Sequence, residues 1–273
     1  MKKTLLFKTT LLSVLSFSLL LPGASFANAY GTIDGGTAYA SFNSNSKKSS
    51  PAELNHMKNE IKMLLEENKS GSSQSLDRMS PYMTQSDIQF IHNIIELKKA
   101  NPQLSTEELS NIVFPVRSGV ASLRSISSGW AALNAAEKSL AIEYPAQALI
   151  VNLAKTNTDK ITRDQYPGWI DGDKGNAFRH ALWNAIMSVT IGKDLAEKFA
   201  TAHENNGLTI VQQLAQSWHG FNGIEHKSMD MHNNLKGRDC VKTSEFLSSV
   251  TNTELAKRVQ KKIDNNELII LVK

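Results

Sequence analysis

Five of the seven histidines in this 273-residue chain lie within residues 173–238, close to acidic and amide side chains. Glu204 directly follows His203, and Asp230 lies two residues before His232. Histidine and carboxylate side chains bind divalent metal ions and transfer protons in enzyme active sites. We therefore predict that this stretch forms a polar functional site.

The first element expected to position these residues is a helix over residues 175–191, which ends at Gly192. Four-residue spacing places His180 and Asn184 on one face of that helix, with Trp183 close to the same face. A helix that turns these side chains inward suits the wall of a pocket. The alternative is that His180 is an ordinary core histidine, hydrogen-bonded to a carbonyl group.

A second helix is expected to begin at Asp194, with Glu197 completing an N-terminal capping box, and to end before the turn at 205–207. This places His203 on the buried side of the last turn and Glu204 at the helix end. The helix dipole disfavours an acidic residue at a C-terminus. The unfavourable position of Glu204 therefore indicates a specific role in the site, rather than a charge that is only solvated.

A third helix would carry His226, Asp230 and Asn234 on one face, provided that the segment is helical throughout. His232 and Asn233 would then point in another direction and would reach the site only through a distortion. The two asparagines could instead hydrogen-bond to the loop that precedes the first of the three helices.

The first 27 residues are expected to be a secretory signal peptide, cleaved after Ala27. Lys2 and Lys3 form its basic start, residues 11–21 its apolar segment, and Ser-Phe-Ala its cleavage site. The apolar run is shorter than the roughly 20 residues that span a membrane. We therefore expect an exported mature protein without a membrane span. Its single cysteine, Cys240, cannot form an internal disulfide bond.

The net charge of the mature chain gives no strong sign of nucleic-acid binding. Cleavage would remove three lysines and lower the formal charge from +4 to +1. No sustained run of Lys and Arg remains, so the electrostatic term that dominates nucleic-acid affinity has no obvious source.

The rest of the sequence predicts an all-α fold in two parts. Residues 28–50 are rich in Ser, Asn, Gly and Ala and are expected to be a disordered tether. Apolar residues at helical spacing predict a helical accessory region over 51–114 and a helical domain over 128–273. The last residues, 267–273, favour a β-strand that must pack on the helices, because a lone strand is unstable. Helix N-caps, each followed three positions later by an acidic residue, are predicted at Ser50, Thr84, Ser105, Asn134 and Thr251.

Several segments resemble an uncharacterised bacterial domain of secreted Gram-positive and polymorphic toxin-like proteins. They read GNAFRHALWNA, AHE, MDMHNN and GR, and the upstream WAALNAAEK and YPAQAL resemble the same domain. The resemblance covers about residues 128–273 and implies no established activity. Because the domain occurs in toxin-like proteins, the resemblance leaves open that the chain binds an immunity protein or a surface partner. The residues that match its defining positions are Arg179, His180, Trp183, His203, Glu204, Asp230, His232, Asn233 and Asn234.

The order of these residues is also similar to that of the HD-type metal phosphohydrolases. This similarity implies His180, His203 and Asp230 as metal ligands, although Glu204 stands where that group has aspartate. Zinc-dependent phospholipases C and related single-strand nucleases also place such ligands on helices. They use the mature N-terminal residue as a ligand, and here that residue would be Asn28, at the end of the expected tether.

We therefore predict a secreted, all-α hydrolase of a phosphoester or a similar extracellular bond. A zinc or manganese ion on the three ligands would lower the pKa of a bound water. Glu204 or His232 would transfer the proton, and Arg179 would stabilise the developing anion. The further predicted site residues are Trp183, Asn184, Asn233 and Asn234. Two alternatives stay open: a non-enzymatic toxin-like or surface-interaction module, held by a structural hydrogen-bond network, and a metal-free glycan hydrolase with Glu204 as general acid.

Overall fold

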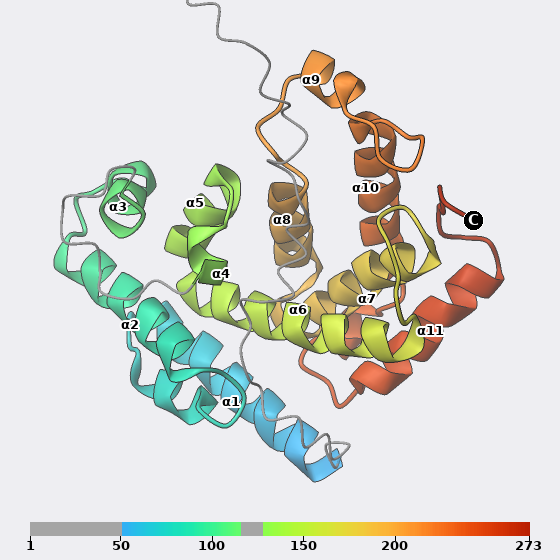
Figure 1. Cartoon of the computed structure of the whole chain (residues 1–273). Coiled ribbons are helices and arrows are strands. Elements are labelled where there is room, and N and C mark those ends of the chain that lie inside the picture. The colour runs from blue at the N-terminus through green and yellow to red at the C-terminus, as the bar shows by residue number, and fades with distance from the viewer. Residues whose placement is uncertain (1–50, 116–127) are drawn as a thin grey trace, which may run out of the picture. The chain divides into compact units, whose positions relative to one another are not determined.

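The computed structural model describes residues 51–115 and 128–273, and all regular secondary structure in these ranges is helical (Figure 1). The all-α prediction is therefore confirmed for this part of the chain. The expected signal peptide, the tether with Ser50 and most of the linker lie outside the described residues. The helices are α1 (Pro51–Lys69), η2 (Gln74–Met79), α2 (Gln85–Ala100), α3 (Thr106–Val113), α4 (Ser128–Ala131), α5 (Ala135–Glu143), α6 (Pro145–Gln165), α7 (Lys174–Ile191), α8 (Lys193–His203), α9 (Ile210–Ala215), α10 (Gly223–Asp239), η3 (Thr243–Glu245) and α11 (Asn252–Asp264).

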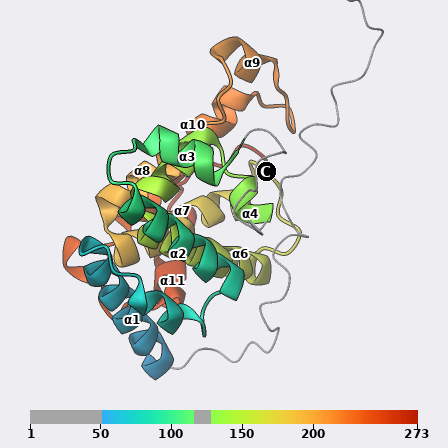
Figure 2. The ribbon, with the colours of Figure 1, turned by 90° about the vertical axis from the view of Figure 1, so that its left-hand side faces the viewer.

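Helix α7 is the central element of the described residues. Every residue from Gly175 to Ile191 is buried except Arg179. A helix that is buried all round must be covered by several neighbours, and α7 packs against α6, α8, α10 and α11 (Figure 2). The predicted helix that ends at Gly192 is confirmed. Its central position explains why its polar side chains meet residues from several other helices.

Helices α7 and α10 come into backbone contact at Gly237. A Cβ atom at this position would lie 2.0 Å from the carbonyl oxygen of Ala181, so only glycine fits. The close approach lets residues of α10 on either side of Gly237 reach the interior of α7. Asn234 and Arg238 both hydrogen-bond to the buried side chain of Asn184.

Four of the predicted helix starts are confirmed by side-chain caps. Thr84, Ser105, Asn134 and Thr251 each accept a hydrogen bond from the backbone N–H three residues later. The predicted start of α8 is wrong, because α8 begins at Lys193 and has no side-chain cap. Gly192 both ends α7 and precedes α8, so the connection has no residue left to form a capping box.

The N-terminal helices share a hydrophobic core with the rest of the described chain. Helices α1 and α2 pack on α6, and α3 packs on α5. Two buried polar contacts reinforce this packing. The indole N–H of Trp130 donates to Asp87 at 2.7 Å, and Lys58 donates to the carbonyl groups of Ser248 and Val250. Independent folding of residues 128–273 stays a prediction, to be tested on the fragment without α1–α3.

The C-terminal residues do not form the expected β-strand. The side-chain amide of Asn233 in α10 donates to the carbonyl of Ile269 and accepts from its N–H, both at 2.9 Å. The N–H groups of Leu271 and Val272 donate to the carbonyl of Gly172, both at 2.9 Å. An asparagine side chain and a loop carbonyl thus supply the hydrogen bonds that a neighbouring strand would otherwise supply.

Helix α9 packs mainly on α10 and leaves the apolar side chains of Ile210, Val211 and Leu214 exposed. It is far too short to span a membrane, which needs about 20 residues. No other helix within residues 51–115 or 128–273 combines the length and apolar composition of a membrane span.

Candidate metal site

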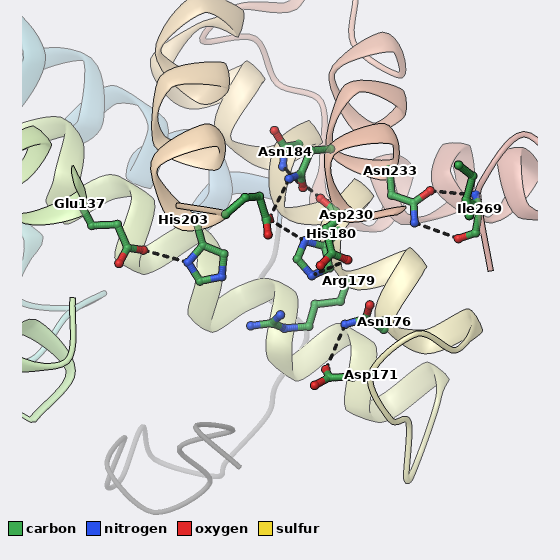
Figure 3. Close-up of polar contacts among 12 residues, drawn as sticks. Glu137, Asp171, Asn176, Arg179, His180, Asn184, His203, Asp230, Asn233 and Ile269 are labelled. Carbon is green, nitrogen blue, oxygen red and sulfur yellow. Dashed lines mark hydrogen bonds and ion pairs between the residues drawn. The ribbon is translucent and has the colours of Figure 1, made fainter. Parts of the chain in front are cut away.

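Three side chains from three helices meet beside α7 (Figure 3). They are His180 of α7, Glu204 at the end of α8 and Asp230 of α10. Nδ1 of His180 lies 3.5 Å from Oε1 of Glu204, and its Nε2 lies 3.3 Å from Oδ1 of Asp230. One ligand atom from each side chain lies within 4.8 Å of the other two, so the group could hold a metal ion.

This cluster is buried and incompletely hydrogen-bonded. The side chains of His180, Glu204 and Asp230 are 6%, 9% and 16% exposed. Among the described residues, Nδ1 of His180 and Oδ1 of Asp230 have no hydrogen-bond partner. A buried polar atom without a partner costs about 1–3 kcal/mol. A cation bound by one ring nitrogen of His180 and by a carboxylate oxygen of each acid would reduce that cost, so the donor set could hold a metal ion.

The electrostatics of the cluster also favour a bound cation. Burial and the nearby Arg179 lower the pKa of His180 well below its usual range, so the imidazole stays neutral and able to ligate a metal. Burial raises the pKa of Glu204. Burial and the charges of Glu204 and Asp171 raise the pKa of Asp230 well above its usual range. Two buried carboxylates without a cation therefore resist ionisation, and a dication would stabilise their charged forms.

His203 lies beside the cluster but is turned toward another partner. Its Nδ1 lies 2.8 Å from Oε1 of Glu137, and its ring packs edge-on against Trp183 at 5.2 Å between ring centroids. Burial disfavours the imidazolium of His203, but the hydrogen bond to Glu137 and the charge of Glu204 outweigh it and raise its pKa. The structure thus groups Glu204, and not His203, with the other two predicted ligands.

The contact between His203 and Glu137 follows from the capping box of α5. Oε2 of Glu137 accepts from the backbone N–H of Asn134 at 2.9 Å, which leaves Oε1 for His203. The amide of Asn134 in turn donates to the carbonyl of Ala202 at 2.7 Å. One cap therefore fixes both the start of α5 and the end of α8, where His203 and Glu204 lie.

Arg179 precedes His180 and is the only residue of the 175–191 stretch that is not buried. Its Nε donates to Asp159 at 2.8 Å, and its guanidinium lies over the ring of Trp169 at 5.4 Å from the centroid. In Figure 3 the guanidinium lies on the same side of His180 as His203. A small cavity borders this arginine, and its lining residues are Lys155, Thr158, Asp159, Arg179, His180 and Trp183.

Asn184 and Asn234 connect the cluster to the α7–α10 interface. Both side chains are fully buried. The amide of Asn184 donates to Oδ1 of Asn234 at 2.7 Å, and the amide of Asn234 donates to Oε1 of Glu204 at 3.1 Å. Asn234 therefore contacts Glu204 directly, and Asn184 contacts it through Asn234.

The remaining histidines and Asn233 lie outside the cluster. Nε2 of His232 lies 3.0 Å from the carbonyl of Glu267, on the side of α10 that holds the C-terminal residues together with Asn233. His226 contacts the carbonyl of Trp218 at 3.2 Å. Helix α10 is regular over its whole length, so no distortion turns His232 or Asn233 toward the cluster. The structure gives His232 no contact with the residues that it would serve as a proton carrier.

Three residues at the site were not predicted as site residues. Glu137 was visible only as part of a helix cap, and Asp159 only as a polar residue of a long helix. Arg238 was visible only in the dipeptide Gly-Arg of the resemblance. Their partners lie 66, 20 and 54 positions away, so pattern reasoning along the chain could not assign them.

Comparison with known proteins gives one result. No curated protein and no solved structure matches the chain. The segments that carry His180, Glu204 and Asp230, and the pair Gly237-Arg238, all fall within a single matched region. Residues 138–267 match the family model described as a domain of unknown function (DUF6973).

Proposed function

We propose that this chain is an exported, metal-dependent hydrolase that acts on a phosphoester or a similar bond. The observation that carries the proposal is the buried group of His180, Glu204 and Asp230, in which two polar atoms have no hydrogen-bond partner among the described residues. Export rests on the expected signal peptide of residues 1–27, which lies outside the described residues.

The proposed ligand set differs from the one that the HD-type similarity implies, because Glu204 takes the place of His203. The set then has one imidazole nitrogen and two carboxylates. Zinc accepts both kinds of ligand, whereas oxygen-rich sites suit manganese or magnesium. Manganese is therefore at least as good a candidate as zinc, and three protein ligands leave a position open for water or substrate.

The bound dication would lower the pKa of a water molecule and so supply a nucleophile near neutral pH. The residues of the chain supply the remaining steps. His203 accepts the proton of the attacking water, with Glu137 holding the imidazole in one orientation and stabilising its charged form. His203 then donates this proton to the leaving oxygen, so one water is consumed and the ester yields an alcohol and an acid. Arg179 stabilises the negative charge that develops on the substrate.

This assignment moves the proton carrier from Glu204 or His232, the two predicted residues, to His203. The side chain of His203 is 34% exposed, whereas that of Glu204 is 9% exposed. A proton carrier must reach a water molecule or the substrate, and His203 has the better access. Despite burial, the hydrogen bond to Glu137 and the charge of Glu204 raise the pKa of His203, which favours the imidazolium form that donates a proton.

The alternative is a toxin-like or surface-interaction module, in which the same polar residues serve only as a structural network. The hydrogen bonds from Asn184 through Asn234 to Glu204 favour it. The two functions predict different effects of removing a buried acid. In a metal site the acid destabilises the metal-free protein, so its removal should not lower stability, whereas in a structural network its removal should. The Asp230→Asn experiment described in the Discussion separates the two.

We expect His203→Gln to lower kcat by about 100-fold or more, the usual effect of removing a general acid–base group. Glutamine can still hydrogen-bond to Glu137 but cannot carry a proton. Metal affinity should stay unchanged, because His203 is not one of the proposed ligands. The activity is measured on whichever phosphodiester, phospholipid or muropeptide the protein cleaves in the presence of zinc or manganese.

The matched control for this experiment is His232→Gln, because His232 contacts the C-terminal residues instead of the cluster. It should keep the activity of the native protein. Equal activity losses in the two variants would assign the effect to stability rather than to proton transfer. No cleavage of any of the three substrate classes with either metal would overturn the proposed hydrolase.

A further inference from the structure

A continuous chain of hydrogen bonds leads from Arg238 to the candidate ligand Glu204. Nη1 of Arg238 donates to Oδ1 of Asn184 at 3.0 Å. The amide of Asn184 donates to Oδ1 of Asn234 at 2.7 Å, and the amide of Asn234 donates to Oε1 of Glu204 at 3.1 Å. Arg238 is 7% exposed and both asparagines are fully buried, so water does not compete for these bonds.

The guanidinium of Arg238 and the carbonyl of His180 together set the direction of this chain, because the first donates to Oδ1 of Asn184 and the second accepts from its amide at 3.1 Å. An arginine side chain only donates hydrogen bonds, so the oxygen of Asn184 must face it. The NH₂ group of Asn184 must then face Asn234, which forces the oxygen of Asn234 toward Asn184. The NH₂ group of Asn234 is therefore left to donate to Glu204. Without Arg238, the oxygen of Asn184 loses its buried donor, and only two acceptors, the carbonyl of His180 and the carboxylate of Glu204, still hold the amides in this orientation.

The backbone supports the same arrangement. Asn234, Gly237 and Arg238 lie on the side of α10 that meets α7, and the missing side chain at Gly237 lets the two helices touch. At its outer end, Arg238 lies 3.6 Å from the exposed carboxylate of Glu197 in α8. The chain thus runs through α7, α8 and α10, which are the three helices that carry the candidate ligands.

We infer that Arg238, Asn184 and Asn234 are positioning residues that aim the carboxylate of Glu204 at the metal. This inference rests on the proposed metal site. The donor from Asn234 occupies one lone pair of Oε1 and holds the carboxylate in a single orientation. Groups behind a metal ligand commonly change metal affinity by about 10–100-fold when they are removed.

The sharpest test is Asn184→Asp, which reverses the direction of the chain. The new carboxylate can pair with Arg238, so the buried guanidinium keeps a partner, but the carbonyl of His180 loses the donor that Asn184 supplies. The new carboxylate offers only oxygen to Asn234, whose NH₂ group must turn toward it. The oxygen of Asn234 then faces Oε1 of Glu204, and two acceptors repel each other. We expect the dissociation constant for zinc to rise at least 10-fold.

A second variant, Arg238→Met, tests the outer end of the chain. It keeps an apolar stem but removes the donor, so the buried oxygen of Asn184 loses its partner and both amides are held less firmly. Zinc should again bind at least 10-fold more weakly. Arg238→Lys keeps a donor at this end and should restore most of the affinity. Glu197→Gln changes only the exposed partner of Arg238 and serves as the matched control, with native affinity expected.

The readouts are zinc titration and the visible absorption spectrum of the protein loaded with cobalt(II), which reports on ligand geometry and not on overall stability. We expect both to change in Asn184→Asp and in Arg238→Met while the helical circular dichroism of the folded protein is retained. Native zinc affinity and a native cobalt spectrum in either folded variant would overturn the positioning role. If Asn184→Asp does not fold, Arg238→Met and Arg238→Lys decide by the same criterion. A native protein that binds no zinc would overturn the proposed function itself, which is a separate result.

Discussion

Gly237→Ala is expected to destabilise the protein by about 3 kcal/mol or more, the upper part of the usual range for overpacking a tight interface. The added Cβ would lie 2.0 Å from the carbonyl oxygen of Ala181, 2.7 Å from its carbonyl carbon and 2.8 Å from its Cα. All three atoms belong to the backbone of α7, so no side chain can move aside. The helices must separate, and they are the two that carry His180 and Asp230.

A competing effect has the opposite sign but is smaller. Alanine is more favourable than glycine inside a helix by roughly 1 kcal/mol, which cannot offset the clash. Ser228→Ala is the matched control, because Ser228 is an exposed residue of the same helix. Its stability should equal or slightly exceed that of the native protein. Thermal or urea unfolding of both variants gives the comparison, and an unchanged free energy of unfolding in Gly237→Ala would show that α7 and α10 are not in contact there.

Asp230→Asn is expected to have opposite effects with and without metal. In the metal-free protein, burial and the charge of Glu204 raise the pKa of Asp230 well above its usual range. The folded protein then binds this proton more tightly than the unfolded chain does. Its stability therefore falls as the pH rises from the ordinary pKa of an aspartate through the raised one. Asparagine carries no such charge, so the metal-free variant should melt at the same temperature as the native protein or higher at neutral pH.

With metal present, the order should reverse. Zinc or manganese at a hundred times its dissociation constant stabilises a protein by about 2.7 kcal/mol, and Asp230→Asn should lose most of that gain. Asp239→Asn, an exposed position at the end of the same helix, should respond to metal as the native protein does. A metal-free Asp230→Asn variant that melts far below the native protein would instead support the structural network.

The helical framework could be predicted from local patterns. The caps at Thr84, Ser105, Asn134 and Thr251 are set by a side chain and a backbone group three residues apart, so the sequence carries all the information they need. The end of α7 at Gly192 is equally local. The predicted start of α8 is wrong because a single glycine separates the two helices. Gly192 is the N-cap residue of α8, and it has no side chain that could accept a capping hydrogen bond.

The composition of the candidate site could be predicted only in part. The sequence predicted its residue types and the segment that carries them, and the predicted ligands His180 and Asp230 do lie in contact. The exchange of His203 for Glu204 depends on which way the last turn of α8 faces. That direction is set by Asn134 and Glu137 of α5, nearly seventy residues earlier in the chain. Such long-range contacts leave no periodic trace along the sequence.

The C-terminal residues show the same limit. Their apolar, β-branched composition predicts extended backbone with hydrogen bonds to a neighbour, and the backbone of Ile269 does make two such bonds. The partner is the side chain of Asn233 rather than a strand. Asn233 was predicted as a site residue because it matches a defining position of the family resemblance, yet adjacent residues of a helix point about 100° apart. One serves the cluster and the other serves the C-terminal residues.

The central claim is that His180, Glu204 and Asp230 bind one divalent metal ion. Its most direct test is calorimetric titration of the purified, chelator-treated protein with zinc and with manganese, run in parallel on His180→Ala. We predict one ion per chain for at least one of the two metals in the native protein, and no binding at this site in the variant. A native protein that binds neither metal, or a variant that binds as well as the native protein, would contradict the claim.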